Sequence, residues 1–390
     1  MVIAEIARLI FYFLTGLPVA ILVLYGAVIV YFNKKRGEST NDVGNALING
    51  GSSIEPLVSI VVATHNEEMI ISKKIDNLLS SGYPASKIEI IFVDDSDDST
   101  PKIILAAAEK SPNIHLLRFE KRMGYSPSML AGCKAAQGEI LILNDAGSFI
   151  DTHAISKIVC RLRDPKIGVV TGNDVILNVD EEAGKSENLY AKSLNFLRIS
   201  ETNMGSTFFI KGEATGVRKS VVEDIEDANE TFDTTTGLYA RQKGFKVVYD
   251  PEVKFYEYAP DTRSGSIKQK TIRAANLIKV LWRFRGMMFK RKYGKYGSIT
   301  LPFNFASITI LPVYILFWFL SLTALTFLDV GFFVYVWVAL GIFSLLLLVF
   351  STRLLLTFLQ LEYSLLQAIF QVVFVKKSHD KIDTVASTRR

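Results

Sequence analysis

Short apolar runs that end on polar residues constrain the fold of this chain more than any other feature. We predict strands at 57–62, 88–93, 114–119 and 140–143, and helix-like stretches separate them. Strands that alternate with helices form βαβ units around a mostly parallel sheet. The last run, Ile-Leu-Ile-Leu, has the composition of a strand that is buried on both faces. The middle of the chain is therefore predicted to be an α/β domain.

Polar side chains gather where three of the predicted strands end. They are Thr64, His65 and Glu67 after the first strand, Asp94 and Asp95 after the second, and Asp145 after the fourth. Open α/β sheets bind ligands at the carboxyl ends of their parallel strands, so this clustering predicts a nucleotide site. For Asp145 taken alone, the alternative interpretation is a cap on the following helix.

A long uncharged segment near the N-terminus predicts a membrane anchor. Residues 9–32 carry no charge and are long enough to cross a bilayer, and Lys34, Lys35 and Arg36 follow them. The segment is too long for the apolar core of a cleaved signal peptide. Basic residues favour the cytoplasmic side of a membrane, which predicts that Met1 lies outside and the α/β domain inside.

The C-terminal part of the chain predicts further membrane segments. Residues 301–328 and 330–350 are apolar and long enough to span, and Asp329 joins them. Segment 354–375 carries Glu362, and an ionisable group in hydrocarbon is costly. This segment is either a fourth span that packs against the other helices or a helix along the cytoplasmic interface. Its length favours the span.

Composition agrees with a membrane protein that has a cytosolic domain. The mean hydropathy is +0.27, and the net charge is +5. The basic residues lie beside the apolar segments, which favours a lipid bilayer over nucleic acid as the partner. Cys133 and Cys160 lack metal-ligand spacing, in keeping with a reducing compartment.

These observations divide the chain into six predicted regions. They are an anchor at 1–36, a linker at 37–55, a cytosolic domain at 56–265, an interfacial region at 266–295, transmembrane helices at 296–376 and a tail at 377–390. The interfacial region is inferred from a predicted helix at 266–291, in which basic residues are interleaved with Ile, Leu and Trp.

Six stretches of the chain carry a resemblance to a known family. They are VSIVVATHNEE, FVDDSDDST, GEILILNDAG, KGEATGVRK, TFD and KQKTIR, in that order. In this order and spacing they resemble the family 2 glycosyltransferases with a GT-A fold, in particular their membrane-embedded, cellulose-synthase-like branch. The similarity covers about residues 56–285. It implies a multi-pass enzyme of the cell membrane with its Rossmann-like GT-A domain in the cytoplasm.

The resemblance also implies roles for individual residues. The donor-binding residues are Thr64, His65, Glu67, Asp95, Asp145, Lys270 and Arg273. The acceptor-binding residues are Gly212, Glu213, Ala214 and Thr215. Asp233 matches the general base, and Asp145 also matches a ligand of a divalent cation, Mg²⁺ or Mn²⁺. Inverting transfer needs one carboxylate to take the proton of the acceptor hydroxyl, and a cation or Arg stabilises the departing diphosphate.

The chain departs from the family pattern at several of these positions. Gly147 replaces the second acid of the Asp-x-Asp motif, which predicts weak metal binding. Tyr125 stands where the family usually has Lys. Lys270 and Ala274 replace the Gln and the Trp of the Gln-x-x-Arg-Trp motif, and loss of that Trp argues against processive synthesis.

The function that fits best is transfer of a single sugar to a polyprenyl-phosphate-linked lipid in the membrane. Small members with this layout resemble glycolipid mannosyltransferases of glycan assembly, including N-glycan assembly. GDP-mannose is therefore the first expected donor and a UDP-sugar the second. A processive polysaccharide synthase is the alternative enzyme, and a catalytically silent membrane scaffold is the alternative outside the enzymes.

Overall fold

The structure, a computed structural model, describes residues 2–34, 55–226, 230–258 and 263–374. Its centre is an eight-stranded sheet in the order β3-β2-β1-β4-β7-β6-β8-β5. The strands are β1 (Val58–Thr64), β2 (Ile88–Asp94), β3 (Ile114–Arg118), β4 (Ile140–Asp145), β5 (Phe149–Ile150), β6 (Ile167–Ile176), β7 (Thr215–Arg218) and β8 (Lys246–Glu257). This mixed α/β sheet confirms the predicted fold class.

One half of the sheet is parallel and the other half is mixed. β3, β2, β1 and β4 pair in parallel, as the alternation of strands and helices predicts. β7 runs antiparallel to both β4 and β6. It was not predicted, because its four residues, Thr-Gly-Val-Arg, carry no apolar run. β8 pairs in parallel with β6 and antiparallel with β5.

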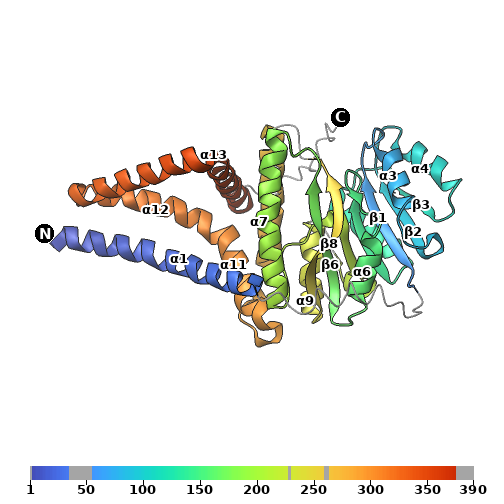
Figure 1. Cartoon of the computed structure of the whole chain (residues 1–390), viewed down its shortest axis with the longest axis horizontal. Coiled ribbons are helices and arrows are strands. Elements are labelled where there is room, and N and C mark those ends of the chain that lie inside the picture. The colour runs from blue at the N-terminus through green and yellow to red at the C-terminus, as the bar shows by residue number, and fades with distance from the viewer. Residues whose placement is uncertain (1, 35–54, 227–229, 259–262, 375–390) are drawn as a thin grey trace.

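Helices cover both faces of the sheet (Figure 1). One face carries α3 (Ile71–Leu79), α4 (Thr100–Ala108) and α6 (Ala154–Leu162), and the other carries α5 (Tyr125–Ala135), α8 (Lys219–Val222) and α9 (Phe232–Gln242). Successive side chains of a strand point to opposite faces. Ile60 of β1 therefore packs in the core under α3, and Val61 packs in the core under α5. The central strands are buried on both faces, as their composition predicts.

Two long helices flank the sheet. α7 (Glu182–Met204) stands between the sheet and the apolar helices in Figure 1. α10 (Arg263–Phe284) is shorter than the helix predicted at 266–291, because a 3₁₀ turn at Arg285–Met287 follows it. That turn contains Gly286, a poor helix former.

The apolar helices extend together away from the sheet (Figure 1). Two helices are long and apolar enough to cross a membrane, α1 (Val2–Lys34) and the helix Tyr296–Thr326. The latter contains α11 (Leu301–Phe305) and α12 (Leu311–Thr326), joined by a wider π-helical turn. The predicted tail and the predicted linker up to residue 54 lie outside the described residues.

The C-terminal apolar helix differs from the two helices predicted for this part of the chain. Segments 330–350 and 354–375 were expected as two helices, but α13 (Val330–Phe374) is one continuous helix. Neither Gly nor Pro interrupts the chain between the two segments, so nothing ends the helix there. Its C-terminal part packs against α10, where Thr271 Oγ1 lies 3.4 Å from Gln367 Oε1.

Candidate functional site

The loops that follow β1 and β2 are hydrogen-bonded to each other. Thr64 Oγ1 donates to Asp94 Oδ1 over 2.8 Å, and the backbone N–H of Glu67 donates to Thr100 Oγ1 over 2.9 Å. Between them, Asn66 adopts a φ of 57°, a conformation that Asn tolerates better than most residues. Its backbone N–H donates to Ser96 Oγ. The first predicted donor loop is thus held in one conformation by the second.

Asp95 lies at the centre of this pair of loops. Its Oδ1 is 2.8 Å from His65 Nδ1, and its Oδ2 accepts the backbone N–H groups of Met123 and Gly124. The side chain is almost fully buried. The structure therefore brings the predicted residues His65 and Asp95 together and connects them to the start of α5.

Asp145 is the last residue of β4. Its carboxylate is hydrogen-bonded to Tyr125, the residue that stands where the resembled family usually has Lys. Tyr125 OH donates to Asp145 Oδ1 over 2.7 Å. Burial and the negative charge of Glu213 raise the pKa of Asp145 to about 6, while Tyr125 and Arg273 act in the opposite direction. Because Asp145 belongs to a strand and bonds Tyr125, the alternative interpretation as a helix cap does not hold.

A lysine that the sequence analysis missed lies beneath the turn after Asp145. Lys74 is fully buried, and its Nζ donates to Asn144 Oδ1 and to the carbonyl of Ser148. Burial lowers its pKa to about 7, against the opposing charge of Asp145. One signal was available, because Lys74 occupies the same helical face as Ile71, Ile75 and Leu78, which predicts a core position.

Asp233 lies in the first turn of α9, against the turn that the acceptor was predicted to meet. Thr231 occupies the N-cap position, so Asp233 is not the cap. The backbone of Gly212 donates to its carboxylate. Burial, followed by the charge of Glu213, raises the pKa of Asp233 to about 6. A carboxylate with this pKa can accept a proton near neutral pH.

The 3₁₀ turn Gly212–Ala214 connects Asp233 with the end of β4. The main-chain oxygen of Glu213 accepts hydrogen bonds from Asn144 Nδ2 and from Ser148 Oγ. Within the described part of the chain, Glu213 Oε2 is buried without a hydrogen-bond partner. We call Asp145, Glu213 and Asp233 the carboxylate cluster.

The other two predicted acceptor residues turn inward. Ala214 is fully buried in the core, and Thr215 Oγ1 bonds to Thr171 Oγ1 and to the carbonyl of Lys211. Both residues are shielded from solvent, backbone included, and Thr215 pairs in the sheet with Leu143 and Thr171. Lys211, which precedes the turn, forms ion pairs with Asp174 and Glu257.

The two predicted donor-binding bases of α10 have different surroundings. Arg273 is exposed, and the charges of the carboxylate cluster raise its pKa although desolvation lowers it. Lys270 faces α7, where its Nζ is 3.7 Å from Glu187 Oε2 and lies over the ring of Tyr190. The structure thus associates Arg273 with the carboxylate cluster and Lys270 with α7.

Gly212 has no room for a side chain. A Cβ at this position would lie 2.7 Å from Tyr125 Oη and 3.4 Å from Asp233 Oδ1. We predict that Gly212→Ala lowers the transfer rate about tenfold or more, because small displacements of reacting groups are costly. Steady-state rates measure the effect.

Two variants control this prediction. At Gly286 a Cβ meets no atom within 4 Å, so Gly286→Ala should keep normal activity. Removing the clashing hydroxyl should relieve the defect, so that Gly212→Ala combined with Tyr125→Phe is no less active than Tyr125→Phe alone. Full activity of Gly212→Ala would show that Tyr125 and Asp233 need not hold their positions.

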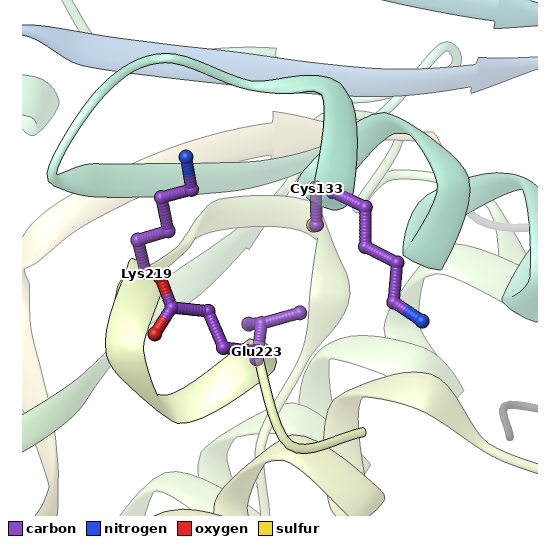
Figure 2. A pocket seen from close by; sticks show the side chains of 5 residues that line it. Cys133, Lys219 and Glu223 are labelled. Carbon is purple, nitrogen blue, oxygen red and sulfur yellow. The ribbon is translucent and has the colours of Figure 1, made fainter. Parts of the chain in front are cut away.

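A surface depression lies at the opposite end of β4. It is lined by Cys133, Lys134, Lys219, Val222 and Glu223, as Figure 2 shows. The backbone of Lys219 bonds to Glu139, just before β4, whereas Asp145 ends this strand. Cys133 and Cys160 are both buried free thiols. This depression is not part of the site.

The fold and the site define a glycosyltransferase of the GT-A class, with carboxylates gathered at the carboxyl edge of an α/β sheet. Residues 59–226 match the model of glycosyl transferase family 2. The chain contains a family 2 glycosyltransferase domain and is an enzyme of this type, which confirms the predicted family and argues against a silent scaffold.

Two relatives agree with this assignment, and one solved structure has the same fold. The poly-β-1,6-N-acetyl-D-glucosamine synthase of Staphylococcus aureus (strain COL) is 28% identical over 293 residues, which are 72% of this chain and 69% of the relative. The synthase of Staphylococcus epidermidis is 28% identical over 275 residues, 69% of this chain and 65% of the relative. A mannosyltransferase from Pyrobaculum calidifontis, solved with GDP-Man and Mn²⁺, has the same fold, with a TM-score of 0.71 at 19% identity, covering 93% of this chain and 100% of that one.

Proposed function

We propose that this enzyme transfers a single sugar, with inversion, from a nucleotide donor to a lipid-linked acceptor in the membrane. The observation that carries the proposal is the position of Asp233, whose carboxylate has a pKa raised to about 6 and contacts the backbone of Gly212. Asp233 takes the proton of the acceptor hydroxyl as this attacks the anomeric carbon. Arg273 offsets the negative charge that develops on the departing diphosphate.

The donor is a nucleotide sugar, with GDP-mannose as the first choice and a UDP-sugar as the second. The loops at Thr64, His65, Glu67 and Asp95 are held together at the carboxyl ends of β1 and β2, where α/β sheets bind nucleotides. The structurally similar mannosyltransferase that was solved with GDP-Man supports the first choice. Asp145 supplies a hard oxygen ligand for Mg²⁺ or Mn²⁺, which would shield the diphosphate charge when bound.

The acceptor is a polyprenyl-phosphate-linked lipid, and the enzyme is a multi-pass protein of the cell membrane with its catalytic domain in the cytoplasm. Two helices have the length and composition of spans. Arg8 of α1 pairs with Asp329, which precedes α13, over 2.7 Å. This pairing supports the proposed topology, in which the N-terminal end of α1 and the turn at Asp329 lie on the same side of the membrane.

A processive polysaccharide synthase is the second candidate, because the staphylococcal relatives are named as such synthases. Ala274 argues against it, since a small apolar side chain offers no flat face on which an acceptor sugar can stack. Single addition therefore remains our proposal.

Product length separates these two functions. The purified protein in lipid nanodiscs is incubated with radiolabelled GDP-mannose, UDP-glucose or UDP-N-acetylglucosamine and a polyprenyl-phosphate acceptor. We expect one labelled lipid that is one sugar larger than the acceptor, and GDP-mannose should be the best donor. A ladder of products would establish the processive synthase, and release of nucleotide without a lipid product would refute the lipid acceptor.

A further inference from the structure

We propose that Glu213 is a second protein ligand of the divalent cation and takes the place of the acid that is missing at Gly147. This inference rests on the proposed function, because the diphosphate of the donor would complete the ligand set. It concerns a residue that the sequence analysis assigned only to the acceptor.

Glu213 has a carboxylate oxygen that the described residues around it leave unsatisfied. Its Oε2 is buried and has no hydrogen-bond partner among the described residues. A buried carboxylate oxygen without a partner carries a large desolvation cost, and a bound cation removes that cost. Lys211 does not do so by direct contact, because it pairs with Asp174 and Glu257 instead.

The backbone of Glu213 is attached to the turn after β4. Asn144 Nδ2 and Ser148 Oγ both donate to its main-chain oxygen, and these residues flank Asp145 in the sequence. These bonds hold the backbone of Glu213 beside the end of β4, where Asp145 lies. A cation bound there would offset the negative charges of both carboxylates.

The side chains available at this site are ligands of the kind that a hard divalent cation prefers. Asp145 and Glu213 supply hard carboxylate oxygens, which suit Mg²⁺ and Mn²⁺. No group of three or more His, Cys, Asp or Glu side chains gathers at metal-binding distance in the part of the chain that the structure describes. Two carboxylates are sufficient, since Mg²⁺ sites of this kind usually take one or two carboxylates together with phosphate oxygens and water.

The test measures Mn²⁺ binding directly and needs no turnover. Purified full-length protein in detergent is titrated with Mn²⁺ in the presence of GDP and, separately, of UDP. Free Mn²⁺ is followed by electron paramagnetic resonance. Glu213→Gln should weaken Mn²⁺ binding about tenfold or more, because even the loss of a group that only supports a metal ligand costs about 10–100-fold. Thermal denaturation without metal shows whether each variant is folded.

Two further variants sharpen the result. Glu230→Gln makes the same change of charge at a carboxylate that pairs with Arg283, and it should bind Mn²⁺ like the wild type. Adding Gly147→Asp to Glu213→Gln restores an acid two residues after Asp145, and this double variant should regain most of the lost affinity.

The possible outcomes separate this inference from the proposed function. Wild-type Mn²⁺ affinity in folded Glu213→Gln overturns the role of Glu213, even if the enzyme transfers mannose. The role of Glu213 as a metal ligand is also overturned if the wild type binds no Mn²⁺ in the presence of either GDP or UDP. If Glu213→Gln loses Mn²⁺ affinity while the wild type transfers no sugar to lipid, the metal site stands and the proposed acceptor fails.

Discussion

Asp233→Asn should lower the rate of sugar transfer by about a hundredfold or more, while binding of the nucleotide sugar survives. The amide keeps the size of the side chain and can still accept the hydrogen bond from the backbone of Gly212, but it cannot take up a proton. The rate of a single turnover measures the chemical step. Calorimetric titration with the nucleoside diphosphate measures binding at the donor site. Asp224→Asn is the matched control, because Asp224 is an exposed acid that pairs with Lys243.

The pH dependence of the wild type provides an independent check on Asp233. A general base must be deprotonated, so activity should rise as the pH increases through about 6, the raised pKa of Asp233. The pKa of Asp145 is raised to a similar value. The fall in activity at acid pH therefore reports the joint titration of Asp145 and Asp233 rather than of either residue alone. A flat profile between pH 5 and 7, or near-normal transfer by Asp233→Asn, would remove Asp233 from the role of base.

The same raised pKa makes a prediction about stability. The folded protein holds the proton of Asp233 more tightly than the unfolded chain does, so the associated stability is present at low pH and is lost as the pH rises through about 6. Asp233→Asn has no proton to lose at this position. It should therefore gain stability relative to the wild type between about pH 4 and pH 7, which thermal denaturation across this range can measure.

Much of this architecture was accessible from the sequence, because the central strands are buried on both faces and must be continuously apolar. The ends of β1, β2 and β4 then bring Thr64, Asp95 and Asp145 to one edge of the sheet. β7 was missed because a strand of four residues gains its place from its neighbours rather than from its own pattern. The continuity of α13 was missed because two apolar segments of plausible length looked like separate spans.

The details of the site depended on tertiary packing that no local pattern encodes. Lys74 lies far from Asn144 in the sequence, and only the packing of α3 on the sheet brings them together. Glu213 was assigned to the acceptor from its motif, while its orphaned oxygen became visible only in the folded chain. Lys270 matched a motif position, yet it faces Glu187 on α7. The motif positions predicted which segments of the chain lie close together, but not which side-chain atoms contact each other.

Glu201 connects the apolar helices α1 and α11 to the catalytic domain, and its loss should have the largest effect on stability. It lies on α7 and is fully buried. Its two oxygens accept hydrogen bonds from Tyr25 OH of α1, Asn304 Nδ2 of α11, Thr207 Oγ1 and the backbone N–H of Phe208. These donors offset the cost of burying the carboxylate, and removing it leaves them unsatisfied.

We expect Glu201→Ala to cost about 3 kcal/mol of stability or more, because several buried donors lose their acceptor and each unsatisfied group costs about 1–3 kcal/mol. Tyr25→Phe removes one donor whose bond is long, at 3.3 Å, and should cost about 1 kcal/mol or less. Glu109→Ala, at an exposed position of the catalytic domain, should change stability by less than about 0.5 kcal/mol. Thermal denaturation of the three purified variants in one detergent gives the comparison.

The consequence should reach the active site, because α11 and α10 share one apolar cluster. Leu301 and Ile308 of the apolar helix pack in this cluster with Ile278 and Leu281 of α10, the helix that carries Arg273. If Glu201 fixes α1 and α11 on α7, then Glu201→Ala should reduce transfer at temperatures where the protein remains folded. The affinity of Glu201→Ala for the nucleotide should fall together with its transfer activity, because Arg273, a proposed donor-binding residue, is displaced. A Glu201→Ala protein that denatures like Glu109→Ala would show that Glu201 is not what holds the apolar helices to the catalytic domain.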